Sequence, residues 1–382
     1  MAEGESYFAF KKRGHENPWL DFLRSLAIAL VLARHGQRAF LAYREQDAQG
    51  LDLIMLNGWV GVDLFLVLSG YLITTNLIRI SGQQPLRYLS TYLFRRAMRI
   101  LPAYYAALFL TVVGFFPLYG VSSENLLQRV VYHLLLLQDY LPADINVTFW
   151  SLGVEEKFYL VAPMIVAVFA MSRRPIAFVV FASCLIMISP LLRTLVYFHT
   201  PISMNYEEFW PIYRSPFHAV LEPLVLGVIV AIIRDRDYLV LRAKTAMLLL
   251  MSSLLVLLIW LATHELMAEI SLIDITIQPL LLAIVSAVSV FAASALSSRH
   301  LPGEAFFRII ARLSFTLYLI HYPLLPLSIA LTNIWGGSAA VFWLVFLGMS
   351  LLLAILLHFA VEKPFLMARD AFGQRELRCQ KA

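Results

Sequence analysis

The chain has 382 residues, of which 60% are hydrophobic and 14% are charged, and its formal net charge is +5. A soluble domain carries about 25% charged residues, so this composition, with a mean hydropathy of +0.75, argues against a soluble globular protein. A basic soluble chain would suggest a nucleic-acid partner. In a membrane protein the same charge fits the excess of lysine and arginine on the cytoplasmic side, and no nucleic-acid partner is expected.

The apolar segments predict an all-α bundle of about ten transmembrane helices. Each segment is roughly 18–24 residues long, the length needed to cross a hydrocarbon core of about 30 Å. An eleventh apolar run, near 126–137, is too short to cross and is expected to lie along the outer surface or to re-enter. No linker or second domain interrupts residues 1–382. The ten spans are predicted at 20–42, 58–79, 100–120, 150–171, 176–197, 216–233, 244–263, 274–297, 309–332 and 339–361.

The N-terminal segment has two possible interpretations. A basic stretch at 11–13 precedes the first apolar run, as in a signal peptide. That run is long, contains Arg24 and lacks a small-x-small cleavage site, so we predict a retained first helix. The two cysteines, Cys184 and Cys379, form neither a disulfide framework nor a metal site. No cluster of metal-binding residues has a credible spacing, and no metal is expected.

The basic residues predict the orientation of the bundle. With the N-terminus in the cytoplasm, about 22 lysines and arginines lie in cytoplasmic segments and about 3 lie outside. The outer ones are Arg44, Arg129 and Arg214. Both termini are therefore predicted to be cytoplasmic, with tails at 1–18 and 366–382.

The first span carries several charged side chains, which are costly in a bilayer and are functional candidates by default. Arg24 and His35 are eleven positions apart, so they project from nearly the same helix face about 16 Å apart along the axis. Asp21 lies three residues before Arg24 and could pair with it. Arg34 and Arg38 are expected to extend to the outer boundary.

Depth estimates place ionisable residues from four spans in one layer of the outer half. They are His35, Asp63, Glu155 and His321, with Tyr318 close to the last. A neutral imidazole can take a proton from a hydroxyl, and a carboxylate can orient that imidazole. We predict His35 as a catalytic base, with Glu155 and Asp63 as functional carboxylates. His321 and Tyr318 are predicted supporting residues, although an interhelical contact would explain them equally well.

Two further features are open to more than one interpretation. Ser69, followed by Gly70, could be a nucleophile, but close helix packing is the favoured interpretation. Arg95, Arg96 and Arg99 could reflect topology alone, or they could bind a phosphorylated ligand, because guanidinium groups clamp phosphates. Arg24 could then extend the phosphate or thioester path into the bilayer.

Six segments together resemble the bacterial acyltransferase 3 family. Each is moderately specific alone, but they occur in order between about residues 20 and 365. Residues 172–300 match only loosely, apart from Arg214 and the stretch 222–227. Many members carry an extra helix and a soluble esterase-like domain; this chain stops soon after Phe365, so any second transfer step is expected to need another protein. The matching segments are Leu20 to Arg24 continuing to His35, 61–73, 95–102, 150–160, 314–323 and 362–365.

The resemblance implies ten helices in the bacterial cytoplasmic (inner) membrane and both termini in the cytoplasm. It also implies an acyl-coenzyme A donor, with acetyl the expected acyl group, and O-acylation of a carbohydrate such as an O-antigen, an exopolysaccharide or a glycoside. His35 would be the catalytic residue, Arg24 its motif partner, and the basic cluster at 95–99 a coenzyme A contact.

A transporter or flippase of a polar metabolite or lipid-linked sugar is the alternative from another functional class. Buried charges in a ten-helix bundle would serve transport equally well. Transport predicts substrate movement without thioester consumption, whereas the acyltransferase predicts thiol release that depends on an acceptor.

Overall fold

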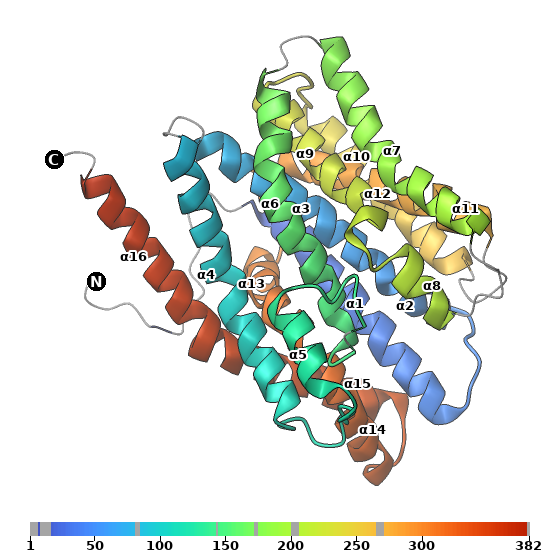
Figure 1. Cartoon of the computed structure of the whole chain (residues 1–382). Helices are drawn as coiled ribbons and strands as arrows, with labels where there is room; N and C mark the ends of the chain where they lie inside the picture. Colours follow the sequence, from blue (N-terminus) through green and yellow to red (C-terminus); the bar gives the residue numbers. More distant parts are fainter. Residues whose placement is uncertain are drawn as a thin grey trace.

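The computed structural model describes residues 7, 17–80, 85–142, 144–171, 175–199, 206–264 and 271–379. These residues form an all-helical bundle without a strand (Figure 1), which confirms the predicted fold class. Most of the predicted tail at 1–18, including the basic stretch at 11–13, lies outside them. The α-helices are α1 (Pro18–Arg44), α2 (Leu51–Leu56), α3 (Val60–Ile80), α4 (Pro85–Val112), α5 (Leu126–Leu134), α6 (Trp150–Met171), α7 (Pro175–His199), α8 (Tyr206–Tyr213), α9 (Leu221–Asp235), α10 (Ala243–Thr263), α11 (Leu272–Ile275), α12 (Ile277–Ser294), α13 (Glu304–Ile320), α14 (Leu325–Ile334), α15 (Ala339–Leu357) and α16 (Lys363–Cys379).

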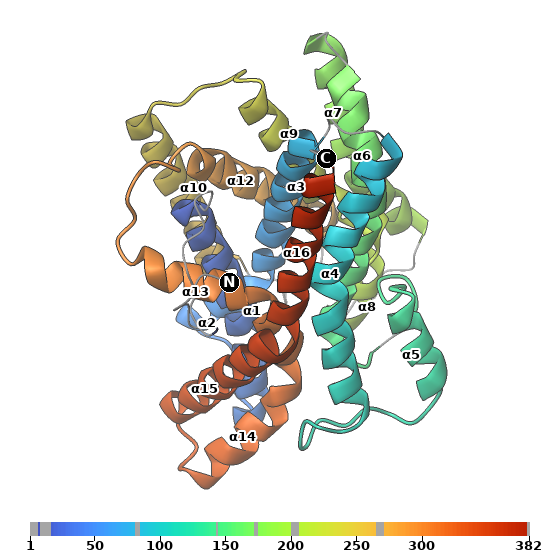
Figure 2. The same cartoon turned by 90° about the vertical axis from the view of Figure 1, so that its left-hand side faces the viewer.

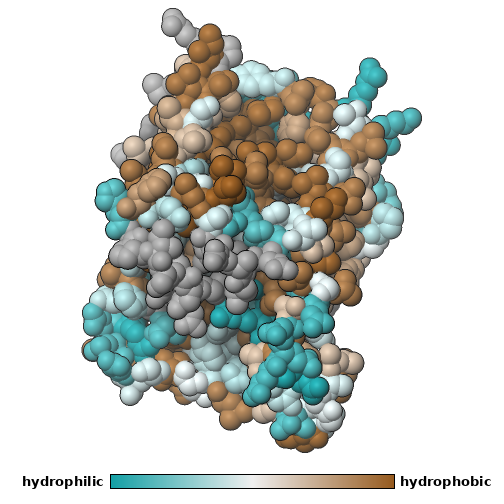
Figure 3. Space-filling model, turned by 90° about the vertical axis from the view of Figure 1, so that its right-hand side faces the viewer, coloured by the Kyte–Doolittle hydropathy of each residue, from teal (hydrophilic) through white to brown (hydrophobic). Residues whose placement is uncertain are grey.

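Several helices are long and apolar enough to cross a membrane. In the described part of the chain, five helical segments meet this condition, and the bent pair formed by α13 and α14 makes six if it is counted as one span. Side chains such as Leu191 of α7 and Leu248 of α10 expose more than half of their surface. In Figure 3, hydrophobic residues cover much of the upper part of the face shown, and a contiguous exposed apolar surface of this kind is typical of contact with a membrane or a partner. The count of ten spans and the cytoplasmic termini stay predictions.

Glycines allow the central helices to approach each other closely. A Cβ on Gly70 of α3 would lie 2.1 Å from the Leu224 carbonyl oxygen, and one on Gly227 of α9 would lie 2.2 Å from that of Val67. Small residues at such crossings let helix backbones pack directly against each other in membranes. The crossing of α3 and α9 thus fixes where the polar residues of α3, including Ser69, meet other helices.

We expect Gly227→Ala to destabilise the bundle, because its new methyl group would meet backbone atoms that cannot move aside independently. Overpacking of this kind costs typically 1–3 kcal/mol, which would appear as a lower midpoint of thermal unfolding in detergent. Gly348→Ala is the matched control, since a Cβ at Gly348 meets nothing within 4 Å. Equal midpoints for the two variants would contradict the close crossing of α3 and α9.

Helix α4 differs from the predicted span at 100–120. It begins at Pro85 and ends at Val112, and the residues after it form turns. Gly114 adopts a left-handed conformation (φ 74°) that closes the helix, and the Phe115 N–H returns to the Leu110 carbonyl, as in a glycine C-cap. The basic cluster at 95–99 therefore lies within the helix, not on a loop before it.

The predicted span at 309–332 is broken into two helices. The segments Glu304–Ile320 and Tyr322–Ile334 are bent by 62° relative to each other. Pro323 lacks a backbone N–H, so it cannot continue the helical bonding to the Leu319 carbonyl. The side-chain amide of Asn146 donates to that carbonyl instead, at 3.1 Å. The bend places His321 at the end of α13 rather than inside a continuous helix.

The short apolar run near 126–137 forms α5, which lies beside α4 (Figure 2). Tyr105 of α4 donates to the Leu134 carbonyl at 3.0 Å. The polar residues Arg129 and His133 are buried against the protein, whereas Leu127 and Leu135 are 79% and 62% exposed. This helix therefore turns its apolar side outwards, as expected for a surface segment in contact with lipid.

Candidate active site

His35 of α1 packs against the bend after α13. The centre of its ring lies 5.2 Å from that of His321 and 5.1 Å from that of Tyr322, which meets it edge-on. The Nδ1 atom of His321 lies 3.0 Å from the Leu317 carbonyl and 2.9 Å from the Tyr318 carbonyl. Since carbonyl oxygens only accept, this Nδ1 carries the proton.

The other nitrogen of His321 is therefore an acceptor. Its Nε2 is buried and has no hydrogen-bond partner among the described residues. The ring that contacts His35 therefore carries an unpaired acceptor at Nε2. The carbonyl groups of α13 determine this tautomer, because they bind the Nδ1 proton. The predicted supporting residue His321 is brought directly to the predicted base.

The charges around His35 are basic. Its principal electrostatic partners are His321, Arg34 and Arg38. Arg34 does not extend to the boundary as expected: it is only 3% exposed, and its Nη1 donates to the Leu56 carbonyl at 2.8 Å. Arg38 is exposed. The two arginines favour a negatively charged species next to His35.

Tyr318 connects α13 to the beginning of α6. Its hydroxyl donates to the Thr148 carbonyl at 2.7 Å and lies 2.7 Å from Ser151 Oγ. Because the tyrosine proton is used for Thr148, Ser151 donates to the tyrosine oxygen. The ring of Tyr318 also lies 5.9 Å from that of His321, so this network reaches the histidine pair.

Glu155 belongs to a second cluster, one turn further along α6. Ser69 Oγ donates to its Oε1, and the Tyr159 hydroxyl donates to its Oε2 at 3.0 Å. Arg24 interacts electrostatically with Glu155. Glu155 is therefore placed beside Arg24 and Ser69, and no described contact joins it to His35. Residues four apart on a helix share a face, so Ser151, Glu155 and Tyr159 line one side of α6.

The basic cluster of α4 continues this line of polar side chains. The Arg96 guanidinium lies 5.4 Å from the centre of the Tyr159 ring, and Arg96 and Arg99 both interact electrostatically with Arg24. Arg95 is exposed. We call this series the polar column: Arg96, Arg99, Tyr159, Glu155, Ser69, Arg24, Ser151, Tyr318, His321 and His35.

Asp63 lies in a different network. Its Oδ1 is 2.6 Å from Arg214 Nη2, and the two side chains are 1% and 2% exposed. The Arg214 guanidinium covers the Trp59 ring, 4.8 Å from its centre. A second buried pair, Arg193 and Glu222 at 2.7 Å, interacts with the first. The expected single layer is thus only partly found: His35 meets His321, while Glu155 and Asp63 have other partners.

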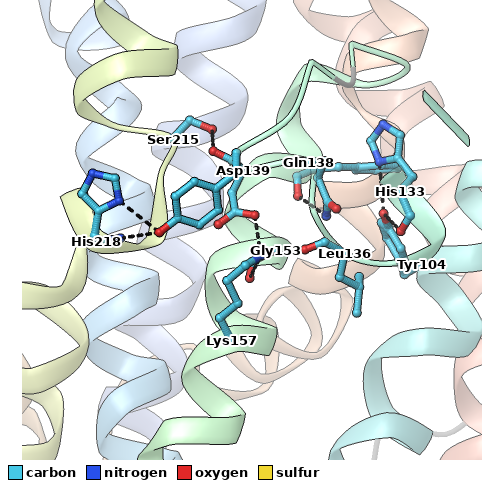
Figure 4. Close-up of polar contacts among 11 residues, drawn as sticks. Tyr104, His133, Leu136, Gln138, Asp139, Gly153, Lys157, Ser215 and His218 are labelled. Atoms are coloured by element: carbon cyan, nitrogen blue, oxygen red, sulfur yellow. Dashed lines mark hydrogen bonds and ion pairs between the residues drawn. The ribbon is translucent and has the colours of Figure 1, made fainter. Parts of the chain in front are cut away.

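The segment before α6 is held by a third polar cluster (Figure 4). Lys157 Nζ donates to Asp139 Oδ1 at 2.5 Å and to the Leu136 carbonyl at 2.7 Å. Burial raises the pKa of the Asp139 carboxyl above its usual value, and Lys157 opposes this rise. Ser215 Oγ donates to the Asp139 carbonyl at 3.2 Å. These bonds hold in place the segment before α6. Asn146 and Thr148 of this segment contact the end of α13.

Sequence reasoning missed Tyr322, Tyr159 and Thr148. A tyrosine four residues after Glu155 was a usable signal for Tyr159, because such residues share a helix face. Nothing in the local sequence pointed to Thr148, whose backbone carbonyl makes the contact. Among the described residues, no group of three or more His, Cys, Asp or Glu side chains is arranged to hold a metal ion.

The bundle and its polar column define a helical membrane protein with an interior site. The sequence profile of the family Acyl_transf_3, an acyltransferase domain, matches residues 17–359. The chain belongs to this family, as its six motifs predicted.

Among curated proteins, the chain is similar to the peptidoglycan O-acetyltransferase OatA of Listeria monocytogenes, with 29% identity over 165 residues, 40% of this chain and 24% of OatA. It is also similar to the putative peptidoglycan O-acetyltransferase YrhL of Bacillus subtilis, with 31% identity over 202 residues, 47% of this chain and 28% of YrhL. The matched regions thus cover about a quarter of each relative's length. No solved structure matches the chain significantly.

Proposed function

We propose that this protein is a membrane O-acyltransferase that moves an acyl group, acetyl in the simplest case, from acyl-coenzyme A to a carbohydrate hydroxyl. The polar column is the observation that carries this proposal, because it links an arginine pair able to bind phosphates with a histidine pair able to move a proton. The relatives are named as peptidoglycan O-acetyltransferases, which supports an acetyl donor and a sugar acceptor. We place the protein in the bacterial cytoplasmic membrane with both termini in the cytoplasm.

The donor binds from the cytoplasmic side in this proposal. Arg96 and Arg99 hold its phosphates through charge-assisted hydrogen bonds, whereas the exposed Arg95 takes no part in binding the donor. The thioester then extends past Arg24 towards His35, a distance of about 16 Å along α1. Glu155 holds Arg24, Ser69 and Tyr159 around this path and so acts on the donor side.

His35 acts as the general base. Its imidazole takes the proton of the acceptor hydroxyl while the oxygen attacks the thioester carbonyl carbon. The carbon–sulfur bond then breaks, and the thiolate leaves with the proton that His35 returns to it. When the acceptor binds, the unpaired Nε2 of His321 takes up a hydrogen bond from His35, which leaves the other nitrogen of His35 to receive the acceptor proton. The basic neighbours of His35 stabilise the oxyanion of the tetrahedral intermediate.

Release of free thiol from acetyl-coenzyme A tests the proposed function. The full chain in nanodiscs would be supplied with the donor, with and without a carbohydrate extract from the source cells. We expect thiol release that requires the extract, together with acetyl ester in the carbohydrate. No release with any short-chain acyl-coenzyme A, combined with no donor binding, would reject the enzyme in favour of a transporter.

Substitution of the two inward-facing arginines is expected to weaken donor binding. Arg96→Gln or Arg99→Gln should raise the KM for acetyl-coenzyme A by about tenfold or more, since the loss of one charge-assisted bond costs roughly 1.5–3 kcal/mol. Arg95→Gln is the matched control, because that side chain is exposed on the same helix turn. The same rise in KM for all three variants would show that net charge, not a fixed phosphate site, attracts the donor.

A further inference from the structure

We propose that the acceptor is an acidic carbohydrate, and that Arg38 binds a carboxylate or phosphate of this acceptor next to the hydroxyl that is acylated. This inference rests on the proposed function and specifies its substrate class. It concerns the end of the polar column at which His35 lies.

Arg38 is placed to contact a molecule that is bound at His35. It follows His35 by three residues on α1, so the two side chains are neighbours on one helix face. Arg38 is also one of the principal electrostatic partners of His35. An acceptor whose hydroxyl reaches the imidazole therefore has its neighbouring substituents within range of this guanidinium.

Arg38 is more exposed than the other polar residues of this helix turn. Arg34 and Gln37 are buried; the former donates to the Leu56 carbonyl at 2.8 Å and the latter to Asp52 at 2.8 Å. Those two side chains stabilise the fold around α2. The Arg38 side chain is exposed, so it is accessible to a ligand from outside the bundle.

Aromatic rings next to His35 add a second feature that fits a sugar. Tyr322 meets the His35 ring edge-on, with 5.1 Å between centres, and Tyr119 meets Tyr322 in the same way at 6.2 Å. Both tyrosines are half-buried. The Tyr119 hydroxyl donates to the Ile145 carbonyl at 2.9 Å, so the two tyrosines offer mainly partly exposed ring surface, which suits the C–H face of a sugar. A guanidinium beside such rings recognises a sugar with a negative charge.

Lipid phosphate could supply the same anion to an exposed arginine at a membrane boundary. An anion on the acceptor and an anion on a lipid headgroup predict different effects of replacing Arg38. If the anion belongs to the acceptor, Arg38 determines which carbohydrates bind. If it belongs to a lipid headgroup, Arg38 responds to the lipid composition and does not distinguish carbohydrates.

The experiment measures carbohydrate binding to the full chain in nanodiscs, using His35→Ala protein so that no turnover occurs. One probe pair is an oligosaccharide that contains glucuronic acid and the same oligosaccharide after reduction of its carboxyl groups. A second pair is a neutral oligosaccharide with and without a phosphate monoester. Each is measured with phosphatidylcholine alone and with added phosphatidylglycerol, for Arg38→Gln and for the control Arg44→Gln, which alters another exposed arginine of α1.

We expect the acidic member of at least one pair to bind about tenfold more tightly than its neutral partner, with the preference lost in Arg38→Gln and kept in Arg44→Gln. Equal binding of acidic and neutral probes would overturn the inference, as would a preference that survives Arg38→Gln. An effect of Arg38→Gln that follows only the phosphatidylglycerol content would identify a headgroup contact instead. These outcomes do not depend on thiol release, so the inference can fail while the acyltransferase stands, or the reverse.

Discussion

Replacement of His35 by alanine is expected to lower acceptor-dependent acyl transfer by about 10²–10⁴-fold, the usual contribution of a general base. The reason is local: His35 contacts the ring of His321, whose unpaired Nε2 can accept a hydrogen bond and so leave the other nitrogen of His35 as the base. The measurement is the thiol-release rate of folded, donor-bound enzyme. The control is His199→Ala, since this histidine is exposed at the end of α7 and its Nδ1 lies 2.8 Å from the Leu195 carbonyl of the same helix.

His321→Asn should have a smaller effect and a different signature. A positioning residue alters the basicity and the orientation of the base, so the pH profile of transfer should move as well as the rate. Transfer that persists in folded His35→Ala protein would remove His35 from the chemistry. If transfer were instead abolished by His321→Asn, the assignment of the two histidines would be reversed.

Removal of Asp63 is expected to act on stability. Breaking a buried ion pair from one side costs about 3–5 kcal/mol, because the remaining charge is left uncompensated in a low-dielectric interior. Asp63→Ala should therefore lower the unfolding midpoint strongly, and the yield of folded protein with it. The double variant Asp63→Ala/Arg214→Ala should be less destabilised than the sum of the single variants, since it leaves neither charge alone.

Asp63→Asn separates this structural role from the catalytic role that the sequence suggested. The amide is nearly isosteric and can still accept from Arg214. We expect this variant to be less destabilised than Asp63→Ala, although the Arg214 charge is still left uncompensated, and to transfer at a similar rate per folded molecule. Loss of transfer with an unchanged unfolding midpoint would restore Asp63 to the catalytic group.

Much of the architecture could be predicted because hydrophobicity and helix geometry act along a single segment. The lengths of the apolar runs indicated a helical membrane bundle, and charged residues within them marked Arg24, His35 and Glu155 as candidates. Because eleven residues make about three turns of an α-helix, Arg24 and His35 were expected on one face of α1. The family motifs could also be identified from the sequence, since each is a short contiguous segment.

Helix ends were predicted less well where single residues decided them. Gly114 closes α4 eight residues before the predicted end of that span, and Pro323 breaks the predicted span at 309–332. Average hydropathy does not register either residue, because both effects come from backbone conformation and a missing N–H. The second of these breaks matters for function, since it sets the position of His321.

The sequence by itself determined the class of the protein, its apolar helices and the set of polar residues available for chemistry. Only the tertiary structure decided which of these residues meet: His35 with His321, Glu155 with Ser69 and Arg24, and Asp63 with Arg214. Depth along a helix follows from its rise per residue. The partner across a helix interface depends on how closely and at what angle two helices cross, and here backbone contacts at Gly70 and Gly227 set that crossing.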